Sequence, residues 1–237
     1  MTASLISLVV AAIAVAGYRV RILPTGVSLL LFAAALAAAV GGVALSAFRL
    51  VRLATSGSPL SMTNLGGLAL GLLILLLPVL TVVGNRRQAR GLPSSHDITT
   101  DTADPPQYID AVRRRLPGEN PLDYAGDALA RQQQAAYPDL LPLVVDAPAA
   151  TVFARALAAM QGLGWEILGQ DAAAGRIEAT DTTFWFGFKD DVVVRIRPDG
   201  ARTRVDVRSA SRVGLGDVGT NARRIRTLLT TLTSAGR

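Results

Sequence analysis

Arginine, glycine and capping residues near the C-terminal end of the chain have the types and spacing of an anion-binding site. Residues 209–221 read SASRVGLGDVGTN and precede a predicted helix, so backbone amides of the glycine-rich loop could hold an anion at the helix start. Arg208 and Arg212 would add guanidinium groups, whose fork suits carboxylate or phosphate. Asp217 and Asn221 could join this site, although a plain helix cap is their commoner role. The segment lacks the GK[ST] sequence of a phosphate-binding loop.

A second candidate surface is aromatic. Residues 182–189 read TTFWFGFK, which places Phe184, Trp185 and Phe186 between two predicted strands. Side chains of this kind often pack in a core. The alternative is an apolar tip that contacts the bilayer, a ligand or a partner protein.

The only histidine of the chain, His96, is followed by acidic residues. Together with Asp97, Asp101 and Asp104 it suggests a metal site, but a lone histidine in a proline-rich segment more often forms a hydrogen bond, and we expect no metal and no cofactor. An enzyme would have to use His96 or a carboxylate such as Asp190 as its general base. The chain has no cysteine, which excludes disulfides, thiolate catalysis and cysteine-ligated metals.

The elements that would position these residues form an α+β soluble domain. Its core, residues 147–237, is predicted as a helix that begins after Pro148, four antiparallel strands and a last helix, and the strands fall near residues 165–170, 176–180, 189–198 and 202–209. Both helices are expected on one face of the sheet, an arrangement similar to helix-grip modules.

The other sheet face is expected to meet water. It carries many arginines and a few acids, which is typical of a solvated face with weak cross-strand ion pairs. An anion-binding face is the alternative. Residues 93–146 are predicted as an irregular linker and extension of the domain, with a helix near 126–136 and an edge strand near 140–146.

Residues 1–92 are apolar and predict an α-helical membrane anchor. They contain no Asp, Glu or Lys, and their hydrophobic runs predict transmembrane spans at about 5–20, 26–48 and 65–83. The first run could also be a signal peptide. Seven of the 24 Lys and Arg residues lie here, which leaves 17 against all 18 acids in the soluble part and argues against nucleic-acid binding.

The charges near the predicted spans bear on membrane orientation. With three spans, Arg49 and Arg52 share one side, and five other arginines share the side of the soluble domain: Arg19, Arg21, Arg86, Arg87 and Arg90. The positive-inside rule therefore favours a cytoplasmic domain.

Five separated blocks of the soluble part resemble the bacterial family called domain of unknown function 1499 (DUF1499). They read HDITTDTADPP at 96–106, AYPDLLP at 136–142, GWEI at 164–167, GRIEATDTTFWFGFKDDVVVRI at 175–196 and DVRSASRVGLGDVGTNARRI at 206–225. The resemblance implies no settled activity. Because some members are lipoproteins or carry export signals, it implies a domain outside the cytoplasm, and we follow it over the arginine count.

These observations predict a multi-pass protein of the inner membrane that acts as a binding module of the cell envelope, without catalysis. Its expected partners are the lipid bilayer and an envelope protein, a lipid headgroup or a small anion. Two alternatives remain: an enzyme for an envelope or lipid-derived substrate, and a structural membrane assembly protein.

Overall fold

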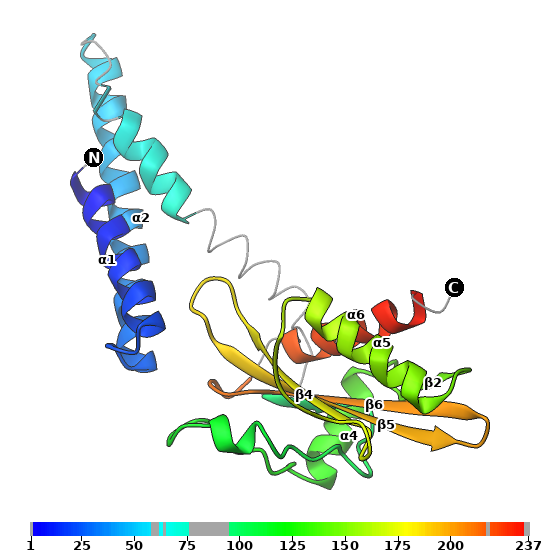
Figure 1. Ribbon diagram of the computed structural model, residues 1–237. Helices are drawn as coiled ribbons and strands as arrows, with labels where there is room; N and C mark the ends of the chain where they lie inside the picture. Colours follow the sequence, from blue (N-terminus) through cyan, green and yellow to red (C-terminus); the bar gives the residue numbers. More distant parts are fainter. Residues whose placement is uncertain (1, 58–61, 64, 76–94, 217–218, 235–237) are drawn as a thin grey trace. The chain divides into compact units, whose positions relative to one another are not determined.

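The computed structural model describes the chain except for residues 1, 58–61, 64, 76–94, 217–218 and 235–237 (Figure 1). The chain divides into two compact units. One comprises residues 1–87 with 185–187, and the other comprises residues 88–184 with 188–237. The first is built from helices and the second is an α+β domain.

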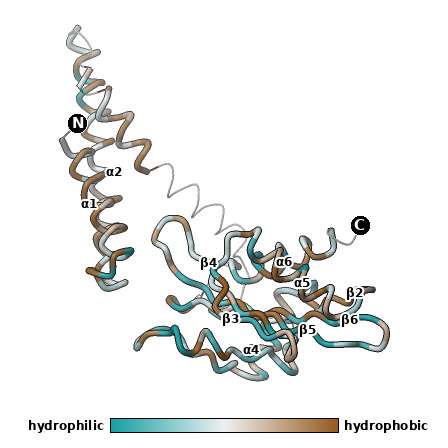
Figure 2. The backbone as a smooth tube through the Cα atoms, viewed as in Figure 1, coloured by the Kyte–Doolittle hydropathy of each residue, from teal (hydrophilic) through white to brown (hydrophobic). Residues whose placement is uncertain are grey.

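The N-terminal unit contains helices α1 (Thr2–Arg19) and α2 (Thr25–Thr55), and a further apolar helical segment, Leu65–Leu75. Figure 2 shows that hydrophobic residues dominate these helices. Within the described residues, α2 is the one helix long and apolar enough to cross a membrane, and a signal sequence would pass the same test of length and composition. The helices of the first and third predicted spans are shorter, and residues 76–83 of the third lie outside the described part of the chain.

The second unit is built on an antiparallel sheet. The four predicted strands are present as β3 (Glu166–Asp171), β4 (Arg176–Thr182), β5 (Lys189–Asp199) and β6 (Arg202–Ser211). Asp199 pairs with Arg202 across a two-residue turn, where Gly200 has a φ of 62° that favours glycine. Alternate side chains of β5, namely Val192, Val194 and Ile196, point to the same face of the sheet, and Val193 points to the opposite face.

Two further short strands extend the sheet to six. Strands β1 (Asp97–Thr99) and β2 (Leu143–Val145) both pair with β6, at opposite ends of its outer edge. Strand β2 matches the predicted edge strand, whereas β1 was not predicted. The segment before the core therefore covers the edge that β6 would otherwise expose.

Helices α5 (Ala149–Gly162) and α6 (Thr220–Ser234) pack against the sheet (Figure 1). Their apolar stripes meet the inward side chains of the strands in one core, which includes Val152, Met160, Val192, Val194, Val207, Ile225 and Leu228. A third helix, α4 (Asp127–Ala136), precedes β2, and its Gln133 bonds to both backbone groups of Thr99 in β1.

The other face of the sheet is covered, and the expectation that it meets water is wrong. Residues 100–124, hereafter the cover segment, run across it and include the short helix η1 (Val112–Arg114). Tyr108 and Ala111 of the cover segment pack with Val193 and Ala210 of the sheet in a small second core. Glu178, Asp206 and Arg208 of this face are therefore buried, whereas Arg197 and Arg204 stay partly exposed. Each buried charge needs a partner from the cover segment or a neighbouring strand.

Candidate functional site: buried ion pairs and an apolar pocket

Arg208, the first predicted anion-binding residue, is fully buried and bonded to a carboxylate. Its Nε and Nη2 donate to the two oxygens of Asp97 in β1, at 3.0 and 2.6 Å, and Nη1 donates to the carbonyl of Pro106 at 3.1 Å. Tyr108 and Tyr124 lie beside the guanidinium, which is 5.0 and 5.5 Å from their ring centres. The Arg208 guanidinium, which was predicted to bind an external anion, therefore makes its hydrogen bonds within the domain.

The same cluster shifts the ionisation of its members. Burial opposes the charge of Arg208, but hydrogen bonding and attraction to Asp97 outweigh it and raise its pKa. Burial, with the nearby charge of Asp97, raises the pKa of Tyr108 well above its ordinary value and that of Tyr124 to about 12. Both phenols are therefore neutral at ordinary pH.

Arg212, the second predicted anion-binding residue, binds the completely buried Asp191 of β5. Its Nη2 donates to Asp191 at 2.7 Å, and Arg115 of the cover segment donates from Nε to the same carboxylate at 2.9 Å. The Thr180 hydroxyl adds a bond of 2.8 Å to it. Remaining guanidinium N–H groups bond to backbone carbonyls, such as that of Asn120 at 2.6 Å from Arg115 Nη1.

Glu178 of β4 fixes the start of η1. Its fully buried carboxylate accepts the backbone N–H groups of Ile109, Asp110 and Ala111 at 2.8, 3.0 and 2.9 Å. Negative charge is favourable at this end of a helical turn. The side chain of Arg176 lies 3.1 Å from the same carboxylate.

A further cluster balances three arginines against three aspartates, namely Arg195, Arg197 and Arg204 with Asp101, Asp104 and Asp206. Asp206 is fully buried and accepts from all three arginines at 2.9 to 3.1 Å. Asp101 and Asp104 of the cover segment close the cluster, and Arg195 reaches them at 3.1 and 3.0 Å. The three arginines are thus balanced by the nearby Asp206 and by two acids that lie 91 to 103 residues earlier in the chain.

On the helix side of the sheet, Arg224 of α6 joins two strand residues. It donates to Asp181 at 2.8 Å and to Asp190 at 2.5 Å. Burial opposes its charge, but attraction to Asp190 and Asp181 outweighs it and raises the pKa of Arg224. Asp190, the carboxylate considered as a general base, is therefore buried and occupied by an ion pair.

Asn221 and His96 meet at the beginning of α6, but through the histidine backbone. The buried Asn221 amide donates to the His96 carbonyl at 3.0 Å and accepts from the Ser209 hydroxyl at 2.7 Å. The amide of Ser211 also donates to that carbonyl, at 2.7 Å. These bonds attach the first strand to the last helix. The described residues contain no group of three or more His, Cys, Asp or Glu that could hold a metal ion.

The remaining predicted site residues are Asp217 and the three aromatic residues of the β4–β5 loop. Asp217 is outside the described residues. In the loop between β4 and β5, Phe184 is 83% exposed, Trp185 is 42% exposed and Phe186 is buried. The predicted tip is therefore apolar and exposed at two of its three positions.

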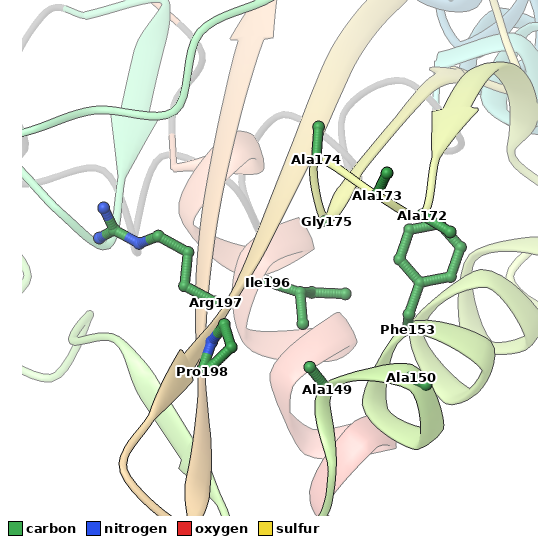
Figure 3. Close-up of a pocket in the computed structure, with 10 residues that line it drawn as sticks. All are labelled: Ala149, Ala150, Phe153, Ala172, Ala173, Ala174, Gly175, Ile196, Arg197 and Pro198. Atoms are coloured by element: carbon green, nitrogen blue, oxygen red, sulfur yellow. The ribbon is translucent and has the colours of Figure 1, made fainter.

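An apolar pocket of about 440 Å³ lies between α5, the β3–β4 turn and the end of β5 (Figure 3). Phe153 and two alanines of α5 form one wall and the alanines of the turn form another, whereas Ile196 and Pro198 belong to β5. Arg197 also contributes to the lining, but Figure 3 shows its guanidinium pointing away from the apolar side chains, and its Nη2 donates to Asp206. The side chains that meet in the pocket are thus almost all hydrocarbon.

Gly175 shapes this pocket by bringing the turn against β5. The Ile196 amide donates to the Gly175 carbonyl at 2.7 Å, and a Cβ at Gly175 would overlap the Ile196 carbonyl oxygen. Its φ of 63° also lies in the left-handed region. The pocket is therefore bounded by elements in fixed contact, which favours a preformed binding site.

Sequence reasoning did not find the pocket or the cover segment. The pocket residues are mostly alanines, which carry no chemical signal, although the three consecutive alanines in the DAAAG turn at 171–175 are unusual where polar turn residues are expected. The ion pairs were hidden by distance along the chain, since Asp97 and Arg208 are 111 positions apart.

Comparisons with known proteins agree with the division between helical region and domain. A family model described as "Protein of unknown function (DUF1499)" matches residues 97–232. No curated protein sequence matches the chain. Among solved structures, the crystal structure of TTHA0849 from Thermus thermophilus is similar with 13% identity over 40% of this chain and 97% of that chain. The TM-score of this match is 0.25.

Proposed function

Because the chain belongs to the DUF1499 family of proteins of unknown function, we propose its role from its own geometry: a membrane-anchored binding module that takes a hydrocarbon chain in the pocket beside α5. The observation that carries this proposal is the apolar pocket itself. It contrasts with the buried charges of the domain, which are bonded to one another. The module binds its ligand without transforming it.

The anchor is the N-terminal helical region. We infer that α2 crosses the membrane, since it has 31 residues and a mean hydropathy of 2.3 over its most apolar window. The proposal extends to spans at about 5–20 and 65–83, which make the protein multi-pass, and to a soluble domain that faces the cell envelope outside the inner membrane. In this arrangement the helix-grip-like domain acts next to a lipid reservoir.

The chemistry of the pocket defines the ligand class. Its volume lies within the roughly 300–1,000 Å³ typical of small-molecule sites. The alanine side chains of the walls have no rotamers to lose, so the pocket loses little conformational entropy when it binds a hydrocarbon chain. Each methylene group removed from water contributes about 0.8 kcal/mol. An acyl chain fits these properties better than a polar metabolite.

Photo-crosslinking of the full-length protein tests this proposal. The chain is reconstituted in phosphatidylcholine nanodiscs with a palmitic acid analogue that carries a mid-chain diazirine, irradiated and mapped by mass spectrometry. We expect labels on the peptides that contain residues 149–153 and 172–175. Ala173→Trp and Ala150→Trp place an indole at the pocket and should reduce this labelling at least about tenfold, equivalent to ~1.4 kcal/mol of lost affinity.

Ala135→Trp is the matched control, because Ala135 is exposed on α4 and does not line the pocket. It should leave the labelling unchanged. Labels spread evenly over the exposed surface of the domain, or retained in full by both pocket variants, would overturn the hydrocarbon site.

A further inference from the structure

The cover segment has an inward and an outward side at residues 108–116. Tyr108 and Ala111 face inward and are buried in the second core, and Arg115 donates to a buried carboxylate of β5. These three residues recur at helical spacing. Glu178 also holds the backbone here, because its carboxylate accepts three consecutive N–H groups. The remaining side chains are therefore presented outward on a backbone that is fixed to the sheet.

The outward side is apolar and basic. Ile109, Val112 and Leu116 are 43%, 55% and 47% exposed. Arg113 and Arg114 are exposed beside them in η1. A single exposed apolar residue is ordinary on a soluble protein, whereas three large ones within eight positions form a patch that favours an interaction surface. These five residues are hereafter called the outer patch.

The outer patch is positively charged. Asp110 is the one acidic residue at positions 108–116, and its carboxylate is only 24% exposed. It lies 3.7 Å from the guanidinium of Arg113 and 3.8 Å from that of Arg176. One carboxylate among these guanidinium groups leaves an excess of positive charge around the apolar side chains.

Charge complementarity identifies what the outer patch meets. The N-terminal part of the same chain is a poor partner, because residues 1–92 contain seven arginines and no acidic residue. A second copy bound about a two-fold axis would set Arg113 and Arg114 against the same arginines. An anionic bilayer complements both components of the patch, since phosphates attract guanidinium groups and the acyl boundary accepts apolar side chains. Helix α2, which is long and apolar enough to cross a membrane, would keep the domain near such a surface.

We propose that the outer patch rests on the surface of a bilayer that contains anionic lipid. Ile109, Val112 and Leu116 enter the headgroup region, and Arg113 and Arg114 bind lipid phosphates. The proposal rests on the membrane anchor of the proposed function and is independent of what the apolar pocket binds. It also accounts for the polar underside of the cover segment: buried ion pairs attach the segment to the sheet, so its apolar side chains are left for lipid.

A spin label at position 112 tests this contact. The chain has no cysteine, so Val112→Cys gives the full-length protein one attachment point. The labelled protein is reconstituted in nanodiscs of phosphatidylcholine, with or without a fraction of phosphatidylglycerol. Electron paramagnetic resonance compares collisions with oxygen, which concentrates in hydrocarbon, and with a neutral nickel chelate, which stays in water. The oxygen-to-nickel ratio should be at least roughly twofold higher when phosphatidylglycerol is present.

Two controls separate the patch from exposure in general. A label at Leu141→Cys, which is 64% exposed and outside the outer patch, should show no response to phosphatidylglycerol. Adding Arg113→Gln and Arg114→Gln to Val112→Cys should abolish the response, and these exposed changes should leave folding intact.

Three results would overturn the proposal. A position-112 label that stays as accessible to the nickel chelate as the Leu141→Cys label, with or without phosphatidylglycerol, would place the patch in water. A label shielded from both oxygen and nickel would indicate a protein contact. Failure of the chain to enter nanodiscs at all would overturn the membrane anchor together with this contact, whereas loss of the palmitate crosslinks alone would affect only the pocket.

Discussion

Asp97 and Arg208 form the best-defined buried pair of the domain, because two parallel hydrogen bonds of 3.0 and 2.6 Å join a carboxylate and a guanidinium that are both nearly inaccessible. Such a pair is a weak source of net stability, since both charges lose their hydration. Its removal from one side only is costly, because the other charge stays buried without its partner. The pair therefore ties β1 and the cover segment to the position of β6.

Arg208→Met should destabilise the domain by about 3–5 kcal/mol, the usual cost of breaking a buried ion pair. The double variant Arg208→Met with Asp97→Asn should be less destabilised than the sum of its single changes, because neither charge is then left alone. Urea unfolding of the full-length protein in detergent measures both effects, with Trp185→Phe present in every variant so that the fluorescence comes from the buried Trp165. Additive losses would show that the two residues act independently.

At the residue scale, sequence reasoning singled out Arg208, Arg212 and Asn221 but did not find their partners. Their types indicated either ordinary ion pairs and a helix cap or a site for an external anion. The structure supplies internal acceptors instead: Asp97 for Arg208, Asp191 for Arg212 and the His96 carbonyl for the amide of Asn221. No local pattern specifies these pairings, because they join segments that only the folded sheet brings together.

At the scale of elements, prediction succeeded where side chains alternate and failed where they do not. Strands β5 and β6 were predicted close to their observed bounds, and helix α6 was predicted to follow them, since their apolar residues recur with periods of 2 and about 3.6. The cover segment has neither period. Its position depends on individual contacts, such as the three backbone N–H groups held by Glu178.

The β3–β4 turn allows a matched test of how one element shapes the pocket. Gly175 and Gly200 have φ of 63° and 62°, so alanine at either position should cost about 1–2 kcal/mol from backbone conformation alone. A Cβ at Gly200 meets open space, whereas one at Gly175 overlaps the Ile196 carbonyl oxygen. Gly175→Ala should therefore lower the free energy of unfolding further than Gly200→Ala does, and should also reduce diazirine labelling of the pocket. Equal stabilities would show that the turn relaxes without cost.

At the scale of the whole molecule, charge and hydropathy are divided sharply along the sequence. The first 92 residues carry seven arginines and no acidic residue, and the following part is nearly neutral. This division predicted a membrane-anchored protein with a separate domain, and the family match over residues 97–232 covers that domain. Periodicity does not decide which side of the membrane the domain occupies, because the same helices insert in either direction.

Membrane topology is the prediction on which the arginine count and the proposed envelope function disagree. Counting arginines near the three proposed spans gives five on the domain side and two on the other, which favours the cytoplasm. A binding module for hydrocarbon at the envelope requires the opposite orientation. We expect an alkaline phosphatase fusion after Arg237 to be active and a green fluorescent protein fusion at the same position to be dark. The reverse result would uphold the arginine count, leave the pocket to be tested on cytoplasmic lipids, and remove the envelope from the proposed function.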